Sequence, residues 1–395
     1  MRVVVAGGGV AALEAVIALR KLAGQAVTLT MLAPETELVY QPLSVGAPFA
    51  TGQAKRYPLS RVAEDLDLEL VHQPLAGVDT EGRTARTGEG AEVPYDALLV
   101  AVGARREPAY EHATTFRGQE DTETLHGLVQ DLEGGYVKRL VFVVPPGTTW
   151  PLPLYELALM TAKRLREVGP GDAEVTLVTP EERPLGIFGM QSSEEVAELL
   201  RESGVAVRTG ASAEIEGAGK LVLHPAGDRL ECERIVTLPR IVGRAIEGLP
   251  SDDHGFIPID ANARVPGADG VYAAGDGTIF PVKQGGIACQ QAVVAAKAIA
   301  HEAGADVEPE PFRPVLRGQL LTGGEPRYLA HHLEGGHGED SEISDHALWW
   351  PPSKISGEYL APYLGEAAES ERQRDAGETP IDPAAMGPAA ARIWI

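Results

Sequence analysis

Cysteine and basic residues are scarce in this 395-residue chain. Cys232 and Cys289 are the only cysteines, and they stand far apart, which excludes a disulfide framework and the CxxC pairs of redox and zinc sites. The 34 Lys and Arg are outnumbered by 57 Asp and Glu, giving a formal net charge of −23. Because nucleic acids and anionic membranes are bound by basic surfaces, we expect neither as a partner.

Long apolar runs and aromatic residues are also few. No uninterrupted run reaches the about 18 apolar residues that cross a bilayer, and Met1 leads directly into an apolar strand without room for a signal peptide. We therefore expect no transmembrane segment and a cytoplasmic protein, with peripheral membrane association disfavoured. The 45 glycines and 44% hydrophobic residues are typical of α/β proteins with tight turns and a sizeable core.

Apolar strands and amphipathic helices alternate through the first 300 residues. This order predicts an α/β fold with two Rossmann-like, doubly wound, three-layer domains and a small C-terminal cap region. The expected strands are 2–6, 26–32, 95–102, 139–144, 174–178 and 229–238, and the expected helices are 10–22, 152–166, 192–203 and 287–300. The predicted domains are 1–112 with 250–305, then 113–249, then a C-terminal region at 306–395 in which 310–365 form a cap and 366–395 a loose tail.

A glycine turn follows the first strand and matches the pattern G-x-G-x-x-G/A. Gly7 permits the tight turn, Gly9 lets the backbone approach a pyrophosphate, and Ala12 lets helix and strand pack closely. Val10 and Ala11 begin the helix, whose N-terminus faces the phosphates with its partial positive charge. The turn therefore predicts a dinucleotide site.

The acidic residue that binds a ribose hydroxyl in such sites is displaced here. The second strand ends Leu32-Ala33-Pro34-Glu35, so that Ala33 occupies the usual acidic position and Glu35 is the nearest carboxylate. Glu35 is either the ribose ligand or a solvated loop residue, and the sequence leaves both alternatives open.

A second motif, about 270 residues later, distinguishes FAD from NAD. The strand of Gly270 to Ala274 ends in Gly275-Asp276, and Pro281 to Gly286 then leads into a helix. This combination resembles the pyridine-nucleotide-disulfide oxidoreductase superfamily of FAD proteins. The resemblance implies that Asp276 binds the ribityl chain and that Lys283, Gln284, Gly285 and Gly286 bring a helix N-terminus to the flavin.

Further segments extend the resemblance over roughly residues 1 to 300. Ala101, Val102 and Gly103 lie in the superfamily's middle motif, with Asp96 before them. Tyr40-Gln41-Pro42-Leu43, Pro184 to Gly189 and Gly255 to Asp260 are most similar to the sulfide:quinone reductase and flavocytochrome sulfide dehydrogenase branch. Gln41 and Pro42 are therefore expected at the cofactor.

The second domain departs from both patterns. Its first strand is followed by Pro145-Pro146-Gly147-Thr148-Thr149-Trp150, with one glycine and with prolines that have no N–H to offer a pyrophosphate. This argues against ordinary NAD(P)H binding. The branch commonly has a cysteine where this chain has Trp150, and a tryptophan cannot form a persulfide. We interpret Cys232 as core packing, and Cys289 as either a helix packing residue or a thiol near the flavin.

Other polar and aromatic groups have weaker interpretations. Glu156 is either a proton carrier near the flavin or an ordinary buried carboxylate. His331, His332, His337 and His346 lack metal-ligand spacing, and we expect no metal. Trp349, Trp350, Tyr359 and Tyr363 form either a cap or dimer contact, which the acidic surroundings favour, or a quinone platform at a membrane edge.

These patterns together predict an FAD-dependent oxidoreductase that passes two electrons from a small-molecule donor to a small-molecule acceptor near Lys283 and Glu156. A quinone is one candidate acceptor. The alternatives are an NAD(P)H- or sulfide-dependent quinone reductase, a flavin-binding protein without turnover that acts as a partner or sensor, and a subunit that passes electrons to a partner protein. A homodimer is compatible with the sequence.

Overall fold

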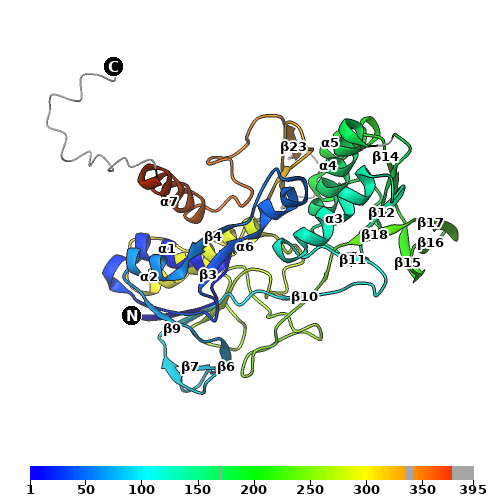
Figure 1. Ribbon diagram of the computed structural model, residues 1–395. Coiled ribbons are helices and arrows are strands. Elements are labelled where there is room, and N and C mark those ends of the chain that lie inside the picture. The colour runs from blue at the N-terminus through cyan, green and yellow to red at the C-terminus, as the bar shows by residue number, and fades with distance from the viewer. Residues whose placement is uncertain (170, 334–340, 376–395) are drawn as a thin grey trace, which may run out of the picture.

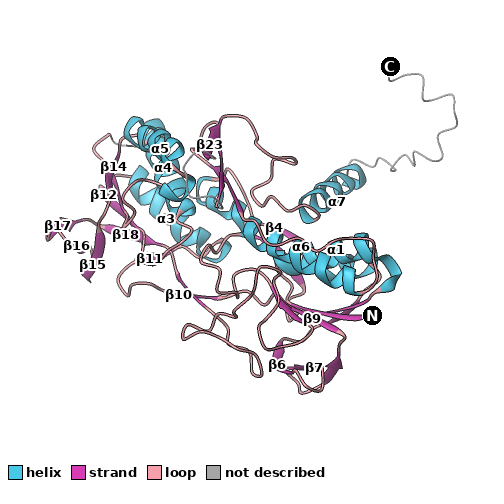
Figure 2. Ribbon diagram, turned by 180° about the vertical axis from the view of Figure 1, so that it is seen from behind, coloured by secondary structure: helices cyan, strands magenta, loops and turns pink. Residues whose placement is uncertain are grey.

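The computed structural model describes residues 1–169, 171–333 and 341–375 and consists of two lobes joined by paired crossover segments (Figure 1). Each lobe is built on a five-stranded parallel sheet with helices on one face and a three-stranded antiparallel sheet on the other (Figure 2). The predicted α/β class with two three-layer units is confirmed. An antiparallel sheet, rather than further helices, supplies the third layer in each unit.

The first sheet has the strand order β20-β9-β1-β2-β5. Its strands are β20 (Val271–Ala273), β9 (Ala97–Val100), β1 (Arg2–Ala6), β2 (Thr28–Leu32) and β5 (Glu69–Val71). Side chains alternate between its faces, as the pleat requires, so that Val3 and Val5 join one core cluster and Val4 and Ala6 another. This two-sided burial explains why these strands appear in the sequence as continuous apolar runs.

Two long helices cover one face of the first sheet. Helix α1 (Val10–Ala23) and helix α6 (Gly285–Glu302) pack side by side through small and branched residues such as Ala15, Ala292 and Ala295. The opposite face carries β6 (Leu75–Asp79), β7 (Thr84–Thr87) and β8 (Glu92–Pro94), an antiparallel meander. The N-termini of α1 and α6 both follow strands of the same sheet, which brings them to one edge of it.

Shorter elements lie between the strands of the first sheet and at the start of the second lobe. They are η1 (Gly24–Ala26), β3 (Glu37–Tyr40), the 3₁₀ helix η2 (Gln41–Phe49), β4 (Lys55–Pro58), α2 (Leu59–Asp65), β11 (Thr114–Thr115) and η3 (Gln119–Asp121). The chain crosses between the lobes twice, at β10 (Arg105–Glu107) and β19 (Arg240–Val242), and these two strands pair antiparallel. The pairing joins the two lobes beside the space between them.

The second sheet has the order β11-β18-β12-β13-β14. Its remaining strands are β12 (Arg139–Val143), β13 (Glu174–Val178), β14 (Val205–Arg208) and β18 (Arg234–Thr237). One face packs on α3 (Thr122–Glu133), α4 (Leu152–Val168) and α5 (Met190–Glu202), and the other on β15 (Ser212–Gly217), β16 (Lys220–His224) and β17 (Asp228–Glu231). The short 3₁₀ helix η4 (Gly186–Phe188) precedes α5.

The C-terminal region contacts both lobes. Strands β21 (Val315–Leu320), β22 (Arg327–His332) and β23 (Ser341–Ser344) form an antiparallel sheet against α4, α5 and α6. Helix α7 (Leu360–Asp375) lies against α1 on the first lobe (Figure 1). Within the described part of the chain, no helix is long and apolar enough to cross a membrane.

Several predicted boundaries are corrected. The expected strand 229–238 is two strands, because β17 pairs with β16 whereas β18 joins the parallel sheet beside β12. The strand expected from residue 26 begins at Thr28, the one expected at 95–102 spans only Ala97–Val100, and the helix expected from 287 begins at Gly285. The loose tail expected from 366 begins as the last part of α7, and residues 376–395 lie outside the described part.

Candidate active site

A cavity of about 1,230 Å³ lies between the lobes and brings distant segments of the chain together. Most of the residues predicted to bind a cofactor line it: Gly7, Gly9, Val10, Ala11, Glu35, Gln41, Pro42, Ala101, Val102, Gly103, Gly275, Asp276, Lys283, Gln284 and Gly285. Three others lie behind its wall: Ala12, Ala33 and Gly286. Ala12 packs in the core and Ala33 donates its N–H to the carbonyl of Val71 in the sheet, so these two act through packing.

The two motif glycines of the first turn are required for different reasons. Gly7 has φ +134°, and a Cβ there would lie 2.2 Å from the carbonyl oxygen of Ala101, so the turn itself demands glycine. A Cβ on Gly9 would meet no atom of the described residues within 4 Å. Gly9 lines the cavity and precedes the first residue of α1. The space beside Gly9 is therefore free for a ligand at a helix N-terminus.

Glu35 lies over the same turn. A Cβ on Gly8 would come 3.2 Å from its Oε2, and Glu35 lines the cavity while remaining exposed. The sequence left Glu35 as either a ribose ligand or a solvated loop residue. Its position at the cavity wall suits the first, because its carboxylate can accept a hydrogen bond from a ligand hydroxyl there.

Asp276 follows β20 and is half-buried in the cavity wall. Burial raises the pKa of its carboxyl, and the charges of Arg106 and Lys283 oppose that rise. Its neighbour Gly275 has φ +84° and donates its N–H to Gln291 Oε1 at 2.7 Å, which fixes the turn from below. Asp276 forms no side-chain hydrogen bond within the described residues, so its oxygens are available to hydroxyl groups of a ligand.

The N-terminus of α6 forms another wall of the cavity. Gln284 caps the helix, because its Oε1 accepts the N–H of Ile287 at 2.8 Å. Gly285 packs closely under Ile355, where a Cβ would lie 2.8 Å from the isoleucine side chain. A helix beginning at a cavity wall carries partial positive charge there, which favours anionic groups.

Lys283 is held by the backbone rather than projecting freely. Its Nζ donates to the carbonyl oxygens of Thr278 at 2.5 Å and Phe280 at 2.8 Å and lies 3.9 Å from the ring centroid of Phe256. Burial lowers its pKa to about 8, against the opposing charges of Asp276 and Asp252. Lys283 therefore loses its charge under mildly alkaline conditions.

This lowered pKa has a consequence for stability. Above about pH 8 the folded protein releases the Lys283 proton while the unfolded chain retains it, so the free energy of unfolding rises with pH through this group. Because Lys283→Met lacks the group, the stability of the unaltered protein relative to the variant should increase from about pH 8 to about pH 10. Urea unfolding at several pH values measures the free energy of unfolding of each protein, and Lys220→Met, at an exposed lysine, is the control. A stability difference between the unaltered protein and Lys283→Met that does not change with pH would contradict the prediction.

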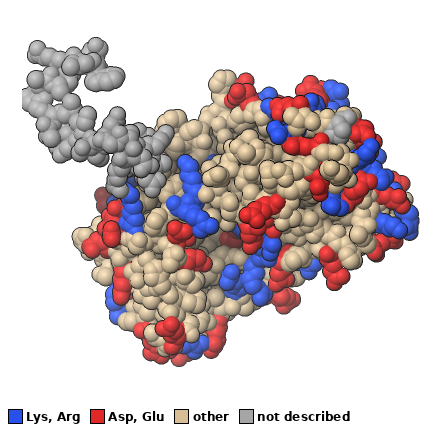
Figure 3. All heavy atoms as spheres, viewed as in Figure 1, with Lys and Arg blue, Asp and Glu red and all other residues tan. Residues whose placement is uncertain are grey.

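Five arginines line the cavity, although the chain as a whole is strongly acidic: Arg105, Arg106, Arg117, Arg240 and Arg244. Figure 3 shows basic side chains gathered in the middle of this face, between the lobes. Arg240 and Arg244 form no ion pair within the described residues. This group was not predicted from the sequence; its local signals are Ala104-Arg105-Arg106 and Pro239-Arg240 at the two crossovers. Such a positive edge suits phosphate groups.

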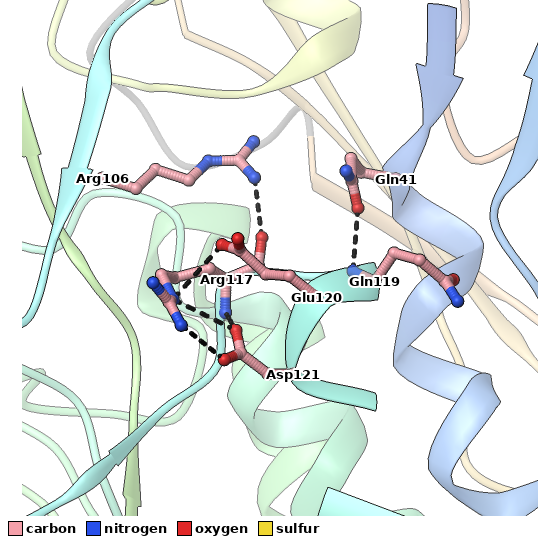
Figure 4. Close-up of polar contacts among 6 residues, drawn as sticks. All are labelled: Gln41, Arg106, Arg117, Gln119, Glu120 and Asp121. Carbon is pink, nitrogen blue, oxygen red and sulfur yellow. Dashed lines mark hydrogen bonds and ion pairs between the residues drawn. The ribbon is translucent and has the colours of Figure 1, made fainter. Parts of the chain in front are cut away.

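The crossover at β10 is tied to the 3₁₀ helices (Figure 4). Gln41 Oε1 accepts the N–H of Gln119 at 3.0 Å, and Arg106 donates to the carbonyl oxygen of Arg117 at 2.6 Å. Arg117 in turn pairs with Asp121 at 2.7 Å and with Glu120 at 3.2 Å. The side-chain oxygen of Gln41 is therefore engaged in holding the lobes together.

The second lobe closes the cavity with the loop 145–150 and the start of α4. Trp150 lines the cavity and packs edge-on against Phe188, with ring centroids 5.7 Å apart. Glu156 is fully buried beneath the loop and also reaches the cavity. Its ion-pair partner is Lys354 from the C-terminal region, a residue that was not among the predicted site residues.

Both cysteines are buried, and the pKa of each thiol is raised. Cys289 is buried between α6 and α1, where burial and the neighbouring Glu14 carboxylate raise its pKa well above the usual range. Burial raises the pKa of Cys232 to about 11. We therefore expect neither thiol to react with a maleimide at neutral pH until urea unfolds the chain. Rapid labelling of the folded Cys232→Ser variant would show that Cys289 is accessible and would contradict this.

The remaining predicted groups lie away from the cavity. Within the described residues no three His, Cys, Asp or Glu side chains could hold a metal ion, and His337 lies outside them.

Asp96 pairs with Arg2 at 2.8 Å at the other end of β9. Tyr363 donates to Asp65 Oδ2 at 2.7 Å and Trp349 packs edge-on against Tyr328, contacts typical of a cap, whereas Trp350 is 88% exposed.

Comparison with known proteins matches residues 1–298 to the family of pyridine nucleotide-disulphide oxidoreductases. The sulfide:quinone oxidoreductase of the hyperthermophilic bacterium Aquifex aeolicus is similar, at 17% identity and a TM-score of 0.79 over 95% of this chain and 92% of that one. The ferredoxin reductase of the CYP199A2 system from Rhodopseudomonas palustris follows, at 20% identity and a TM-score of 0.63 over 85% and 83%. The NAD-dependent persulfide reductase of A. fulgidus has 19% identity and a TM-score of 0.58 over 85% and 64%.

These structural similarities establish a shared fold. The first of them includes the C-terminal region, which lies beyond the family-matched residues. The predicted resemblance to this superfamily is confirmed.

Proposed function

This chain belongs to the family of pyridine nucleotide-disulphide oxidoreductases, and we propose that it binds FAD non-covalently and passes two electrons from a small-molecule donor to a small-molecule acceptor. The observation that carries the proposal is the single cavity lined both by the turn Gly7–Ala11 and by Gly275, Asp276 and Lys283 to Gly285. Its volume of about 1,230 Å³ exceeds the roughly 300–1,000 Å³ of ordinary ligand pockets, which suits a dinucleotide beside a second small molecule.

The residues present fit FAD in a definite order. The turn at Gly9 and the N-terminus of α1 would hold the pyrophosphate, aided by the arginine edge, and Glu35 would accept a ribose hydroxyl. Asp276, whose oxygens have no protein donor within the described residues, would accept hydroxyls of the ribityl chain. The N-terminus of α6, capped by Gln284, would stabilise negative charge on the flavin.

FAD supplies the two-electron chemistry when bound. The protein binds and orients it, and the loop 145–150 with Trp150 lines the cavity from the second lobe. Lys283 adds positive charge that declines above about pH 8. Glu156 is a carboxyl at the cavity wall; burial raises its pKa, and the Lys354 ammonium opposes that rise, so Glu156 is a candidate for proton exchange.

A nicotinamide or sulfide donor with a quinone acceptor is the second candidate. A further cavity of about 750 Å³ adjoins Thr148 and Thr149 and is lined by Glu181 and Arg183 beyond β13. Against a nicotinamide, Pro145 and Pro146 offer no N–H, and the Glu181 carboxylate already accepts Tyr155 Oη at 2.6 Å and Thr179 Oγ1 at 2.9 Å. Against persulfide chemistry, Trp150 stands at the cavity and neither cysteine lines it.

A protein that binds flavin without turnover, as a partner or sensor, is the candidate of a different class. Anaerobic mixing of the FAD-loaded protein with NADH, NADPH, sulfide or small thiols separates these functions. Bleaching of the flavin absorption within seconds, and its return on adding a quinone, supports the oxidoreductase and names its donor class. A flavin band that no donor bleaches supports the partner or sensor. A protein that retains no flavin at all overturns both.

A further inference from the structure

A buried ion pair joins the second lobe to the C-terminal region at the cavity wall. Lys354 Nζ contacts Glu156 Oε1, and their side chains are 5% and 0% exposed. Glu156 lies in the second turn of α4, whereas Lys354 belongs to the segment between β23 and α7. Both residues line the cavity of about 1,230 Å³. A lysine from beyond residues 1–298 is therefore part of this site.

The two oxygens of Glu156 are in different situations. Oε1 accepts Lys354 Nζ and also the N–H of Leu321 at 2.8 Å. Oε2 is buried and has no hydrogen-bond partner among the residues that the structure describes. A buried carboxylate oxygen without a donor is costly, whereas a protonated one, or one facing a ligand, is not. This oxygen marks a position where a proton or a ligand belongs.

The residues on either side of Lys354 hold its backbone in place. The N–H of Ile355 donates to Tyr40 Oη at 2.8 Å, and Ser353 Oγ donates to the carbonyl oxygen of Ile355 at 2.7 Å. Ile355 packs over Gly285 at the start of α6. These contacts hold the backbone on both sides of Lys354, whose buried side chain reaches Glu156.

We propose that Lys354 is a positioning residue that determines how readily Glu156 exchanges a proton with a molecule in the cavity. When the Oε2–H bond breaks and the proton passes to an oxygen or sulfur of that molecule, the carboxylate that remains is stabilised by the Lys354 ammonium; a proton from solvent later restores the acid. The inference rests on the proposed function, since the cavity is taken to hold the flavin and its substrates.

The charges around Glu156 are few. Burial raises its pKa and the charge of Lys354 lowers it, with the Leu321 N–H acting in the same direction as Lys354. Within the described residues no other charged group acts on this carboxyl. Removing Lys354 therefore removes the main stabilisation of the carboxylate, and the pKa of Glu156 must rise further.

Infrared difference spectroscopy of a pH titration tests this without any turnover. The carboxylic-acid C=O band that disappears in Glu156→Gln identifies Glu156. In Lys354→Met its midpoint should move upward by about one pH unit or more, as expected for the loss of an opposite charge in contact. Lys354→Arg should restore the original midpoint. Lys138→Met, which breaks the exposed pair with Asp172, should leave it unchanged.

An unmoved midpoint in Lys354→Met would overturn the inference. If that variant does not fold, the titration of the unaltered protein is the test. The inference requires the Glu156 band to titrate while the protein is folded. A folded protein in which this band does not titrate would overturn the inference. The titration is made on apoprotein and on protein with FAD. A protein that fails to bind FAD but shows the Lys354-dependent shift would refute the proposed function alone.

Discussion

Replacing Gly9 by alanine is expected to weaken FAD binding tenfold or more, a change of about 1.4 kcal/mol or more, while leaving the fold intact. The new methyl group meets no described protein atom within 4 Å, so we expect the apoprotein to keep its stability. It occupies the cavity at the N-terminus of α1, where a pyrophosphate must approach the backbone. Titration of apoprotein with FAD, followed by quenching of flavin fluorescence, measures the affinity.

Two other glycines give matched comparisons for Gly9. Gly7→Ala brings a methyl to 2.2 Å from the Ala101 carbonyl oxygen and should reduce both stability and FAD binding. In Gly127→Ala, in α3, the new methyl group meets no atom of the described part of the chain within 4 Å and should lower neither stability nor FAD binding. If Gly9→Ala binds FAD as well as the unaltered protein, the pyrophosphate is not at this turn.

Replacing Glu14 by alanine is expected to lower the free energy of unfolding by about 2–4 kcal/mol. Glu14 is fully buried in α1, and its carboxylate accepts the N–H groups of Tyr359 at 2.9 Å and Leu360 at 2.7 Å. These donors lie at the start of α7, and the Leu360 N–H is buried, so the substitution should leave both without this acceptor and loosen the C-terminal region from the first lobe. Urea unfolding measures the loss.

Limited proteolysis adds an independent measurement for Glu14. Cleavage near residues 350–360 should accelerate in Glu14→Ala and much less in Glu14→Gln, which keeps one acceptor. Glu194→Ala, on the exposed face of α5, is the control and should change stability by about 0.5 kcal/mol or less. Equal stability of the Glu14→Ala and Glu194→Ala variants would show that the C-terminal region does not depend on this carboxylate.

The features that were predictable from sequence are local ones. The turn at Gly7 and the start of α1 follow from a strand, a glycine pattern and a periodic helix that are adjacent in the chain. The Gly275-Asp276 turn and the start of α6 have the same character. Both motifs are at the carboxyl ends of strands in one parallel sheet, so their convergence on one cavity follows from topology.

Pairing choices were less predictable. Residues 229–238 form one extended, partly apolar run, but the N-H of Cys232 donates to the carbonyl oxygen of Gly219 in the hairpin, whereas Arg234 to Thr237 pair with β12. The sequence pattern gives the extended conformation and not the partner strand. Choosing between partners requires the tertiary arrangement.

Contacts between distant segments left no local signal. Lys354 and Glu156 are 198 residues apart, and Glu14 and Leu360 are 346 residues apart. A single lysine in a proline-rich segment and a single glutamate in an apolar helix each have many ordinary interpretations. Only the packing of the C-terminal region on α1, α4 and α6 gives these side chains their partners.

The most direct test of the central claim compares FAD with FMN in titrations of the apoprotein. If the Gly7–Ala11 turn and the Asp276 segment bind the two ends of one ligand, one FAD should bind per chain, and FMN, which lacks the adenylate half, should bind far more weakly. FMN binding as tightly as FAD, or no binding of either, would contradict the claim that these two segments form one dinucleotide site.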